Sequence, residues 1–421
     1  NRRVAPCGPL LPSREKMAQL WEVVGGADKG GILVREGESV GSPQTSERLS
    51  TGALIEEMEL KGERLHFKRL TGTGPEEGWI SIKLPGKDLA VRTDKTPPKP
   101  RAPPPTAVGP NGEEPLPIAL FFPGQGSQYV KMMENVKDMP KVKEMLEKAG
   151  PILGYDILDI CLNGPESKLE ETKYCQPAMF IGGLAGIEKL KEEKPEAVTR
   201  ASVMAGLSLG EYTALCAAGV MTFEDGLKLV KLRGEAMQEA ALIGKQAMLS
   251  VAGLEKDKLQ PLCVAAAQKE GGDAVCQIAN CLFPGGFSVG GTEKAINFLK
   301  DSAEKAGALQ AKVLKTAGAF HTPLMKPAQD KLAAALEETL PNMKPPQHTV
   351  WMNATAEPVR PGCDPADIVA NLKTQLTNAV LWDTSVKEIL KEGVNEFYEV
   401  GPMKQIKAMM KRIDSKVWSA T

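Results

Sequence analysis

The 421-residue sequence predicts an α/β fold with a parallel central sheet, a smaller inserted subdomain and a separate all-β barrel at its N-terminal end. Three patterns support this prediction. An apolar run at 203–206 leads directly into a helical pattern. Residues 246–315 alternate as β-α-β-β-α-β, and residues 21–85 contain five short strand-like runs separated by glycines.

The composition is that of an ordinary globular protein, with 42% hydrophobic and 25% charged residues and a net charge of −1. This charge gives no general attraction to nucleic acid or membranes, and no apolar run approaches the roughly 20 residues of a membrane helix. The eight cysteines form no C-x-x-C pair, which indicates reduced thiols and no metal site. Because the chain begins with Asn, we expect its natural N-terminus and any targeting peptide to lie outside it.

The N-terminal third is predicted to be a barrel joined to a linker. Residues 1–20 carry no periodicity and are expected to be irregular. In the 21–85 module, strands are expected at 21–24, 32–35, 53–60, 64–70 and 79–82. The run Gly78-Trp79-Ile80-Ser81 resembles SH3-like domains, which implies a structural or docking role with an unknown ligand. Residues 86–116 are a predicted linker, because six of the nine positions 97–105 are proline and favour an extended spacer; a ligand for the barrel is the alternative.

The larger domain is predicted over 117–245 and 316–421. It opens with an apolar run at 118–122, expected to be a buried strand, which ends in Pro123-Gly-Gln125-Gly. These glycines allow main-chain N–H groups to approach a ligand, and a plain β-to-α turn is the alternative. A dinucleotide fingerprint is excluded, because the third glycine and the distal acidic residue are misplaced.

The chain is organised around Gly206-Leu-Ser208-Leu209-Gly210, a G-x-S-x-G motif between an apolar run and an Ala-rich helical pattern. This strand–turn–helix context is typical of a nucleophile elbow in a hydrolase-like core. The glycines permit a sharp turn, and the positive end of the helix favours a developing oxyanion beside the serine. The alternative is a Gly/Ser turn without chemistry.

Two other side chains are candidates for the same site. On a helix predicted over 222–241, Arg233 shares a stripe with Leu229 and Met237. Its guanidinium either reaches the rim or faces a cavity that binds a carboxylate. His321 lies in a loop before a helix expected at 327–340, where an imidazole can face a cleft. Of the other two histidines, His66 falls in a barrel strand and His348 in a connector expected to be exposed.

The segment 246–315 predicts a ferredoxin-like subdomain inserted into the larger domain. Its expected strands are 248–252, 275–279, 287–290 and 311–314, and its helices lie near 255–269 and 292–306. Asn280 is expected between the two middle strands. The remaining chain predicts strands at 349–353 and 395–400, helices near 365–376 and 384–392, and a final helix from Met403.

Six motifs, in this order, make residues 118–418 resemble the malonyl-coenzyme A:acyl-carrier-protein transacylase family, especially its bacterial and plastid type II members. They are Phe-Pro-Gly-Gln-Gly-Ser-Gln at 122–128, Gly-Leu-Ser-Leu-Gly-Glu-Tyr at 206–212, Arg-Gly-Glu-Ala-Met-Gln-Glu-Ala at 233–240, Gly-Ala-Phe-His at 318–321, Gln375-Leu-Thr-Asn378 and Tyr398-Glu-Val-Gly-Pro402. The resemblance does not cover residues 1–115.

The resemblance implies a role for each matched position. Ser208 would be the nucleophile that forms an acyl ester, and His321 its general base. The N–H groups of Gln125 and Leu209 would form the oxyanion hole. Arg233 would pair with the free carboxylate of malonyl, and the main-chain carbonyl of Gln375 would orient the histidine.

Two departures from the family pattern are Leu207, where many members have histidine, and the stretch that starts at Asn280. The commoner form of that stretch is Asn-x-Asn-x-Pro-Gly-Gln, so the role of Asn280 at the active-site rim is left open. Phe320 matches malonyl-selective members, because a smaller residue there makes room for methylmalonyl.

The predicted function is transfer of malonyl from malonyl-CoA to the phosphopantetheine thiol of acyl carrier protein for fatty-acid biosynthesis. No cofactor is expected, since the coenzyme A thioester is a substrate. The alternatives are a discrete acyltransferase serving a polyketide synthase, a serine thioester hydrolase, and a scaffold built on the barrel and linker. We expect a monomer in the plastid stroma, or otherwise in the cytoplasm.

Overall fold

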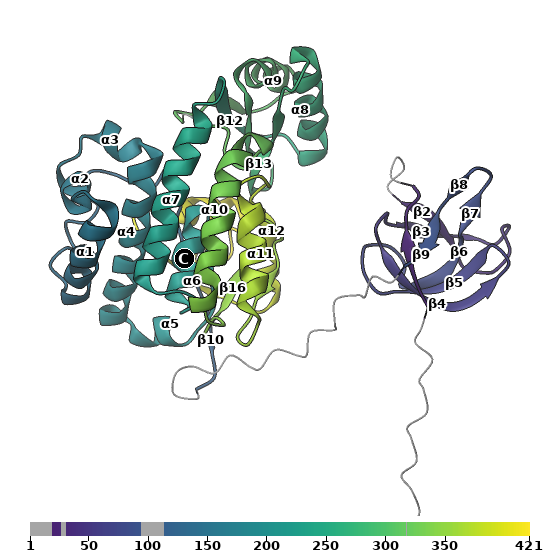
Figure 1. The fold of residues 1–421 in the computed structure, drawn as a ribbon, viewed down its shortest axis with the longest axis horizontal. Helices are drawn as coiled ribbons and strands as arrows, with labels where there is room; N and C mark the ends of the chain where they lie inside the picture. The colour runs from purple at the N-terminus through teal and green to yellow at the C-terminus, as the bar shows by residue number, and fades with distance from the viewer. Residues whose placement is uncertain (1–18, 27–30, 94–112, 317) are drawn as a thin grey trace, which may run out of the picture. The chain divides into compact units, whose positions relative to one another are not determined.

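A computed structural model describes residues 19–26, 31–93, 113–316 and 318–421 (Figure 1). Nearly all of the segment expected to be irregular, and the proline-rich stretch at 97–105, lie outside these residues. The chain divides into two compact units, Asn1–Pro103 and Pro104–Thr421. In the described part of the chain, every helix is too short or too polar to cross a lipid bilayer.

The N-terminal unit is built on one antiparallel sheet with the strand order β3-β2-β6-β5-β4-β1-β9. Its strands are β1 Leu20–Val23, β2 Ile32–Arg35, β3 Gln44–Leu49, β4 Leu54–Lys61, β5 Arg64–Arg69, β6 Glu77–Ser81 and β9 Ala90–Arg92, with a small hairpin of β7 Lys83–Leu84 and β8 Lys87–Asp88. All five expected strands are present. Alternate residues such as Val23, Val34 and Phe67 point into one apolar core.

Two strands of this sheet were not predicted. The β3 sequence, Gln-Thr-Ser-Glu-Arg-Leu, has no alternation of apolar and polar residues, so periodicity gave no signal. The β9 strand lies where the linker was expected to begin, and it pairs with β1 from Trp21–Arg92 to Val23–Ala90. The linker prediction was therefore wrong at its N-terminal end, because a distant partner strand stabilises a three-residue segment that is too short to show a strand pattern.

The larger unit is organised on a five-stranded sheet with the order β17-β16-β11-β10-β18. The strands β10 Leu116–Phe122, β11 Ala201–Gly206, β16 Thr349–Trp351 and β18 Glu396–Glu399 are parallel, and β17 Pro358–Val359 is antiparallel at one edge. In the register of β10 and β11, Phe122 lies opposite Gly206. The loops after both strands therefore emerge together at the carboxyl edge of the sheet, where ligands of parallel sheets usually bind.

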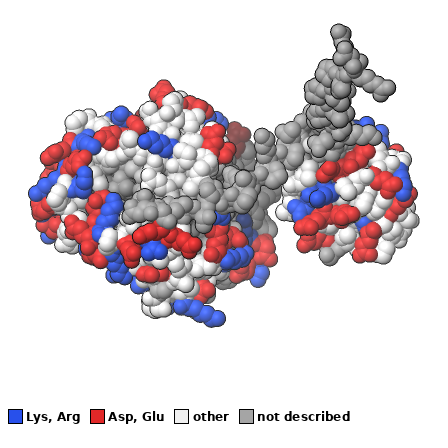
Figure 2. Space-filling view, turned by 90° about the horizontal axis from the view of Figure 1, so that it is seen from below, with Lys and Arg blue, Asp and Glu red and all other residues white. Residues whose placement is uncertain are grey.

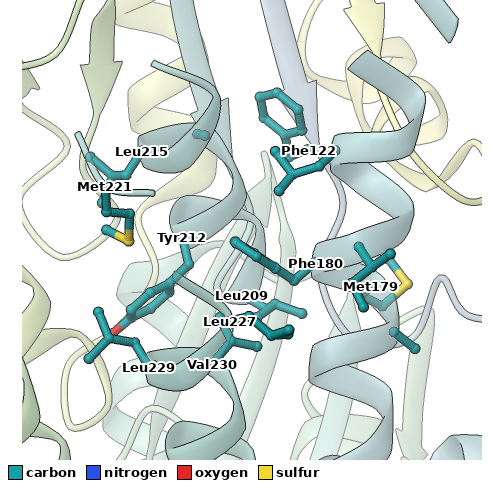
Figure 3. Close-up of a cluster of buried hydrophobic side chains, with 14 of the residues drawn as sticks. Phe122, Met179, Phe180, Leu209, Tyr212, Leu215, Met221, Leu227, Leu229 and Val230 are labelled. Carbon is teal, nitrogen blue, oxygen red and sulfur yellow. The ribbon is translucent and has the colours of Figure 1, made fainter. Parts of the chain in front are cut away.

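Helices cover both faces of this sheet (Figure 1). Successive residues of β10 enter different cores, Phe121 one and Phe122 the other, as expected for a strand buried on both faces. Figure 3 shows Leu209 and Tyr212 of the elbow helix packed with Phe180 and other apolar side chains. The helices are α1 Pro140–Leu153, α2 Ile157–Asn163, α3 Glu166–Glu170, α4 Thr172–Glu193, α5 Pro195–Thr199, α6 Leu209–Ala217, α7 Phe223–Ala241, α10 Lys326–Thr339, α11 Pro365–Gln375, α12 Trp382–Lys391 and α13 Gln405–Ile413, with 3₁₀ turns at Pro323–Met325, Leu340–Asn342 and Trp418–Ala420.

The inserted subdomain has the predicted β-α-β-β-α-β order. Its antiparallel sheet runs β13-β14-β12-β15, with both helices connecting its strands. The elements are β12 Gln246–Ala252, α8 Lys256–Glu270, β13 Cys276–Phe283, β14 Gly286–Thr292, α9 Glu293–Lys305 and β15 Gln310–Val313. Asn280 lies within β13, not between the strands as expected, because β13 and β14 extend to a tight turn at residues 284–285. Backbone hydrogen bonds of Val380 with Ala279 and Cys281, at 2.9 and 2.8 Å, fasten β13 to the rest of the unit.

The surface and the thiols agree with the composition. Figure 2 shows acidic and basic side chains interspersed over the visible face of the larger unit, without a broad field of one sign. The cysteines in the described residues are free, most of them buried. The visible face therefore offers no extended basic patch for nucleic acid.

Candidate active site

The G-x-S-x-G stretch forms a strained turn between β11 and α6. Ser208 has φ 54° and ψ −100°, a backbone conformation that costs a non-glycine residue about 1–3 kcal/mol. A Cβ on Gly206 would lie 1.9 Å from the carbonyl carbon of Gly210, and one on Gly210 would lie 2.1 Å from the Phe122 carbonyl oxygen. Both glycines are therefore required for the turn. The Ser208 N–H donates to Asn353 Oδ1 at 2.7 Å, which helps to hold the serine in this conformation.

His321 faces the serine directly. Its Nε2 lies 2.8 Å from Ser208 Oγ, and its Nδ1 lies 2.9 Å from the main-chain carbonyl oxygen of Gln375. A carbonyl only accepts, so Nδ1 carries the proton and Nε2 is left as an acceptor. Burial, with a smaller effect from the Arg233 charge, lowers the pKa of His321 to about 4. The imidazole is therefore neutral near pH 7 and able to take the serine proton.

The loop that carries His321 is fixed from the inserted subdomain as well. His321 has φ 60°, again outside the usual range for a non-glycine residue. Its carbonyl oxygen accepts a hydrogen bond from Gln277 Nε2 of β13 at 3.1 Å. The imidazole is thus presented between the two parts of the unit.

Arg233 of α7 is completely buried and points into the same site. Its Nη1 donates to Gln176 Oε1 at 2.7 Å, and its Nη2 donates to Gln375 Oε1 at 2.9 Å and to Ser208 Oγ at 3.1 Å. All three acceptors are neutral, and within the described residues the guanidinium forms no direct ion pair, although the nearby Glu211 charge favours its charged form. Burial lowers the pKa of Arg233, but the group remains a cation. Of the two placements that the sequence left open, the structure has the cavity-facing one.

The two predicted main-chain donors lie on adjoining loops. A Cβ on Gly124 would meet the carbonyl oxygen of Leu207 at 2.3 Å, so the loop after β10 contacts the elbow. Leu209 is the first residue of α6. Among the described residues, the N–H groups of Gln125 and Leu209 have no hydrogen-bond acceptor. Free N–H groups beside a helix N-terminus can stabilise an oxyanion that forms next to the serine.

A pocket of about 540 Å³ contains these groups, between the elbow and the inserted subdomain. Six of the seven predicted site residues line it: Ser208, His321, Gln125, Leu209, Arg233 and Asn280. Gln375 lies behind it, 1% exposed, and contacts the site through its neighbours. Asn280 donates to the hydroxyl of Ser288, so it faces the pocket wall without a contact to Ser208.

Sequence reasoning missed three buried polar residues that support the site. Gln176 of α4 accepts from Arg233, and Asn353 follows β16 at the carboxyl edge of the sheet. Glu211 of α6 accepts from the Asn353 N–H at 2.6 Å and from Gln375 Nε2. Burial raises the pKa of Glu211 to about 7, against the effect of these hydrogen bonds and of the Arg233 charge. One signal was available: Glu211 is an acidic residue in an otherwise apolar helix.

The other two histidines lie outside this arrangement. His348 is buried, which corrects the expectation that it is exposed, and its Nδ1 lies 2.8 Å from the Ala201 carbonyl oxygen. His66 stacks on Trp79 with a ring separation of 4.9 Å. In the part of the chain that the structure describes, no three His, Cys, Asp or Glu side chains are grouped to hold a metal ion.

Residues 120–416 match the acyl transferase domain family. The chain is 37% identical over 309 residues to the mitochondrial malonyl-CoA-acyl carrier protein transacylase of Homo sapiens, covering 72% of this chain and 78% of that protein. It is 35% identical over 303 residues to the malonyl CoA-acyl carrier protein transacylase of Escherichia coli K12, covering 70% and 92%.

Solved structures give the same result. A malonyl CoA-acyl carrier protein transacylase from Coxiella burnetii superimposes with a TM-score of 0.66 at 33% identity, covering 72% of this chain and 92% of that chain. A malonyl-transacylase solved with a type II polyketide synthase acyl-carrier protein gives a TM-score of 0.65 at 34% identity, covering 71% and 93%.

Proposed function

Because the chain belongs to the malonyl-CoA-acyl carrier protein transacylase family, we propose that it transfers malonyl from malonyl-CoA to the phosphopantetheine thiol of an acyl carrier protein for fatty-acid synthesis. The observation that carries the proposal is Arg233, a buried cation without an anionic partner beside a hydrogen-bonded Ser208–His321 pair. Glu211 acts on this charge only from behind Gln375, and a buried cation without a directly paired anion is costly. The free carboxylate of malonyl is the partner that the site lacks.

The acylation step uses Ser208 as nucleophile and His321 as base. His321 Nε2 takes the Oγ proton as Oγ attacks the thioester carbonyl of malonyl-CoA. The N–H groups of Gln125 and Leu209 stabilise the oxyanion of the tetrahedral intermediate. The C–S bond then breaks, and the imidazolium returns the proton to the coenzyme A sulfur. The product is malonyl-Ser208 with a neutral His321.

The second step reverses the first with a different thiol. The carrier thiol gives its proton to His321 and attacks the malonyl ester, the C–O bond to Ser208 breaks, and the proton returns to Oγ. The Gln375 carbonyl stabilises the imidazolium in both steps by accepting from Nδ1. No cofactor or metal is required, because the thioester supplies the leaving group.

Two other functions share this chemistry. A relative solved with a polyketide synthase carrier favours a polyketide partner as the second candidate. A thioester hydrolase would release the acyl group to water, and it has no need of Arg233 as a carboxylate clamp.

The test is incubation of the purified chain with radiolabelled malonyl-CoA, with and without acyl carrier protein. We expect label on Ser208 in the absence of carrier and on the carrier thiol in its presence. Rapid release of free malonate without labelled carrier would contradict the transferase and favour the hydrolase. Transfer to a polyketide carrier but not to a fatty-acid carrier would select the second candidate.

We also propose that the core is hydrolase-like and that the N-terminal unit is an SH3-like docking module attached to a monomeric enzyme. The seven-stranded antiparallel sheet of the N-terminal unit, with one apolar core, supports its assignment as an SH3-like module.

The cellular location is a separate proposal. The relatives named in the preceding subsection are mitochondrial or bacterial, so a plastid or cytoplasmic location of this protein remains a prediction. Fluorescence localisation of the full-length protein tests it.

A further inference from the structure

The side chain of Gln375 connects the elbow to Arg233. Its Nε2 donates to the Ser208 carbonyl oxygen at 2.9 Å and to Glu211 Oε2, and its Oε1 accepts from Arg233 Nη2 at 2.9 Å. The side chain is buried, so water cannot replace any of these bonds. Every polar atom of this amide is therefore used within the protein.

Only one orientation of the Gln375 amide satisfies these contacts. If the amide turned over, its NH₂ would face the N–H of Arg233, and its oxygen would face the Ser208 carbonyl and Glu211. A donor would then face a donor at Arg233, and an acceptor would face acceptors at Ser208 and Glu211. The Ser208 carbonyl and an ionised Glu211 accept but never donate. Together they require the amide nitrogen on their side and the amide oxygen on the Arg233 side.

Glu211 is itself held in place. Its other carboxylate oxygen accepts from the Asn353 N–H at 2.6 Å, and Asn353 Oδ1 accepts from the Ser208 N–H at 2.7 Å. Glu211 is 1% exposed and does not line the pocket. It therefore acts on a substrate only through its neighbours, either through Gln375 to Arg233 or through Asn353 to the Ser208 N–H.

We propose that Glu211 is a specificity-determining positioning residue, which fixes the Gln375 amide so that Arg233 is aimed at the carboxylate of the acyl donor. This inference rests on the proposed malonyl transfer. The hydrogen-bond chain runs from Asn353 through Glu211 and Gln375 to Arg233. Arg233 is held only by neutral oxygens, and loss of the Gln375 oxygen frees its guanidinium to turn from the pocket.

The test uses the full chain at pH 8 and compares kcat/KM for malonyl-CoA with that for acetyl-CoA. Glu211→Gln is nearly isosteric, but it offers one oxygen to two donors, the Asn353 main-chain N–H and Gln375 Nε2. The main-chain N–H cannot turn over, so we expect the oxygen to face Asn353. The new NH₂ then faces Gln375 Nε2 and drives the Gln375 amide to turn over. We expect the malonyl preference to fall by about tenfold, while acetyl transfer changes much less. An equal loss for both donors would overturn the inference, because it would indicate damage to the elbow alone.

Gln375→Met keeps the inference testable if Glu211→Gln does not fold, and a double variant tests it further if it does. Gln375→Met removes the amide but keeps the main-chain carbonyl that His321 contacts, and we expect the same selective loss. In Glu211→Gln/Arg233→Ala, the preference should equal that of Arg233→Ala alone, since both changes act through one group. If the losses of malonyl preference from Glu211→Gln and Arg233→Ala were additive in the double variant, Glu211 would not act through Arg233. If the wild type transfers neither acyl group, the proposed function itself fails. If the wild type prefers malonyl and Glu211→Gln keeps that preference, this inference alone fails.

Discussion

Each unit of this protein contains a pocket with arginine side chains, and the two pockets hold them differently. In the larger unit, Arg233 is completely buried and bound by side-chain amides and the serine hydroxyl. In the N-terminal unit, a pocket of about 480 Å³ is lined by Arg35, Arg48 and Arg64, which are half-exposed. These three donate mainly to backbone carbonyl oxygens, for example from Arg64 to Glu38 at 2.7 Å.

The difference lies in how strongly each site distinguishes ligands. Water and salt screen the half-exposed arginines, so any one of them adds little to the recognition of an anion. The buried Arg233 has lost its hydration, and a carboxylate that enters its pocket gains a charge-assisted pair. Under the proposed function, burial therefore makes Arg233 the group that selects between substrates, and four experiments test this difference between the two pockets.

The largest expected effect comes from removing the nucleophile. Ser208→Ala should lower the rate of malonyl transfer by about 10⁴–10⁶-fold, because no other group can form the acyl ester. The measurement is transfer of labelled malonyl to carrier protein. Ser415→Ala, at an exposed position, is the matched control and should leave the rate unchanged. A residual rate within tenfold of the wild type would show that the chemistry resides elsewhere.

The second effect compares the arginines of the two units. Arg233→Ala should remove about 1.5–3 kcal/mol of malonyl binding, a loss of roughly tenfold or more in kcat/KM for malonyl-CoA, with acetyl transfer partly retained. Arg64→Ala should leave both activities unchanged. Steady-state kinetics with the two donors gives the answer. Equal effects from both substitutions would remove the contrast between the pockets.

The third effect concerns acid pH. Because burial lowers the pKa of His321 to about 4, the histidine stays a base well below the usual range of an imidazole. Phenylmethanesulfonyl fluoride modifies Ser208 at a rate that requires neutral His321. We therefore expect this rate to change little with the protonation of His321 between pH 8 and pH 5.5, and to fall near pH 4. A midpoint close to 6.5 would indicate an imidazole exposed to water.

The smallest expected effect is none at all. Deletion of residues 1–112 should leave kcat and KM for malonyl-CoA unchanged, since all the site residues belong to the larger unit. The same deletion with acyl carrier protein as the varied substrate tests a docking role. An increase in KM for the carrier alone would assign the N-terminal unit to carrier recognition, and a loss of acyl-serine formation would contradict its independence from the site.

Local sequence predicted the parts of this fold whose residues interact with near neighbours. The elbow, the helix predicted at 222–241 and the succession of strands and helices in the inserted subdomain all follow from residue patterns over short stretches of chain. The strands β3 and β9 were missed because they are stabilised by partner strands and carry little pattern of their own. The expected exposure of His348 was wrong for a similar reason, since its hydrogen-bond partner Ala201 lies 147 positions away.

By itself, the sequence determined the chemistry available to this protein: a serine on a glycine-flanked turn, one histidine in a loop before a helix, and one arginine on an apolar stripe. Only the tertiary structure decided that these groups meet, with Ser208 Oγ at 2.8 Å from the imidazole and 3.1 Å from the guanidinium. It also decided the roles of Gln176 and Asn353, which lie outside the motifs, and of Glu211, which lies in the motif at 206–212 but was given no role from it. The physical reason is that hydrogen-bond partners and pKa values in a buried site depend on groups brought together from distant segments, and local periodicity does not record those contacts.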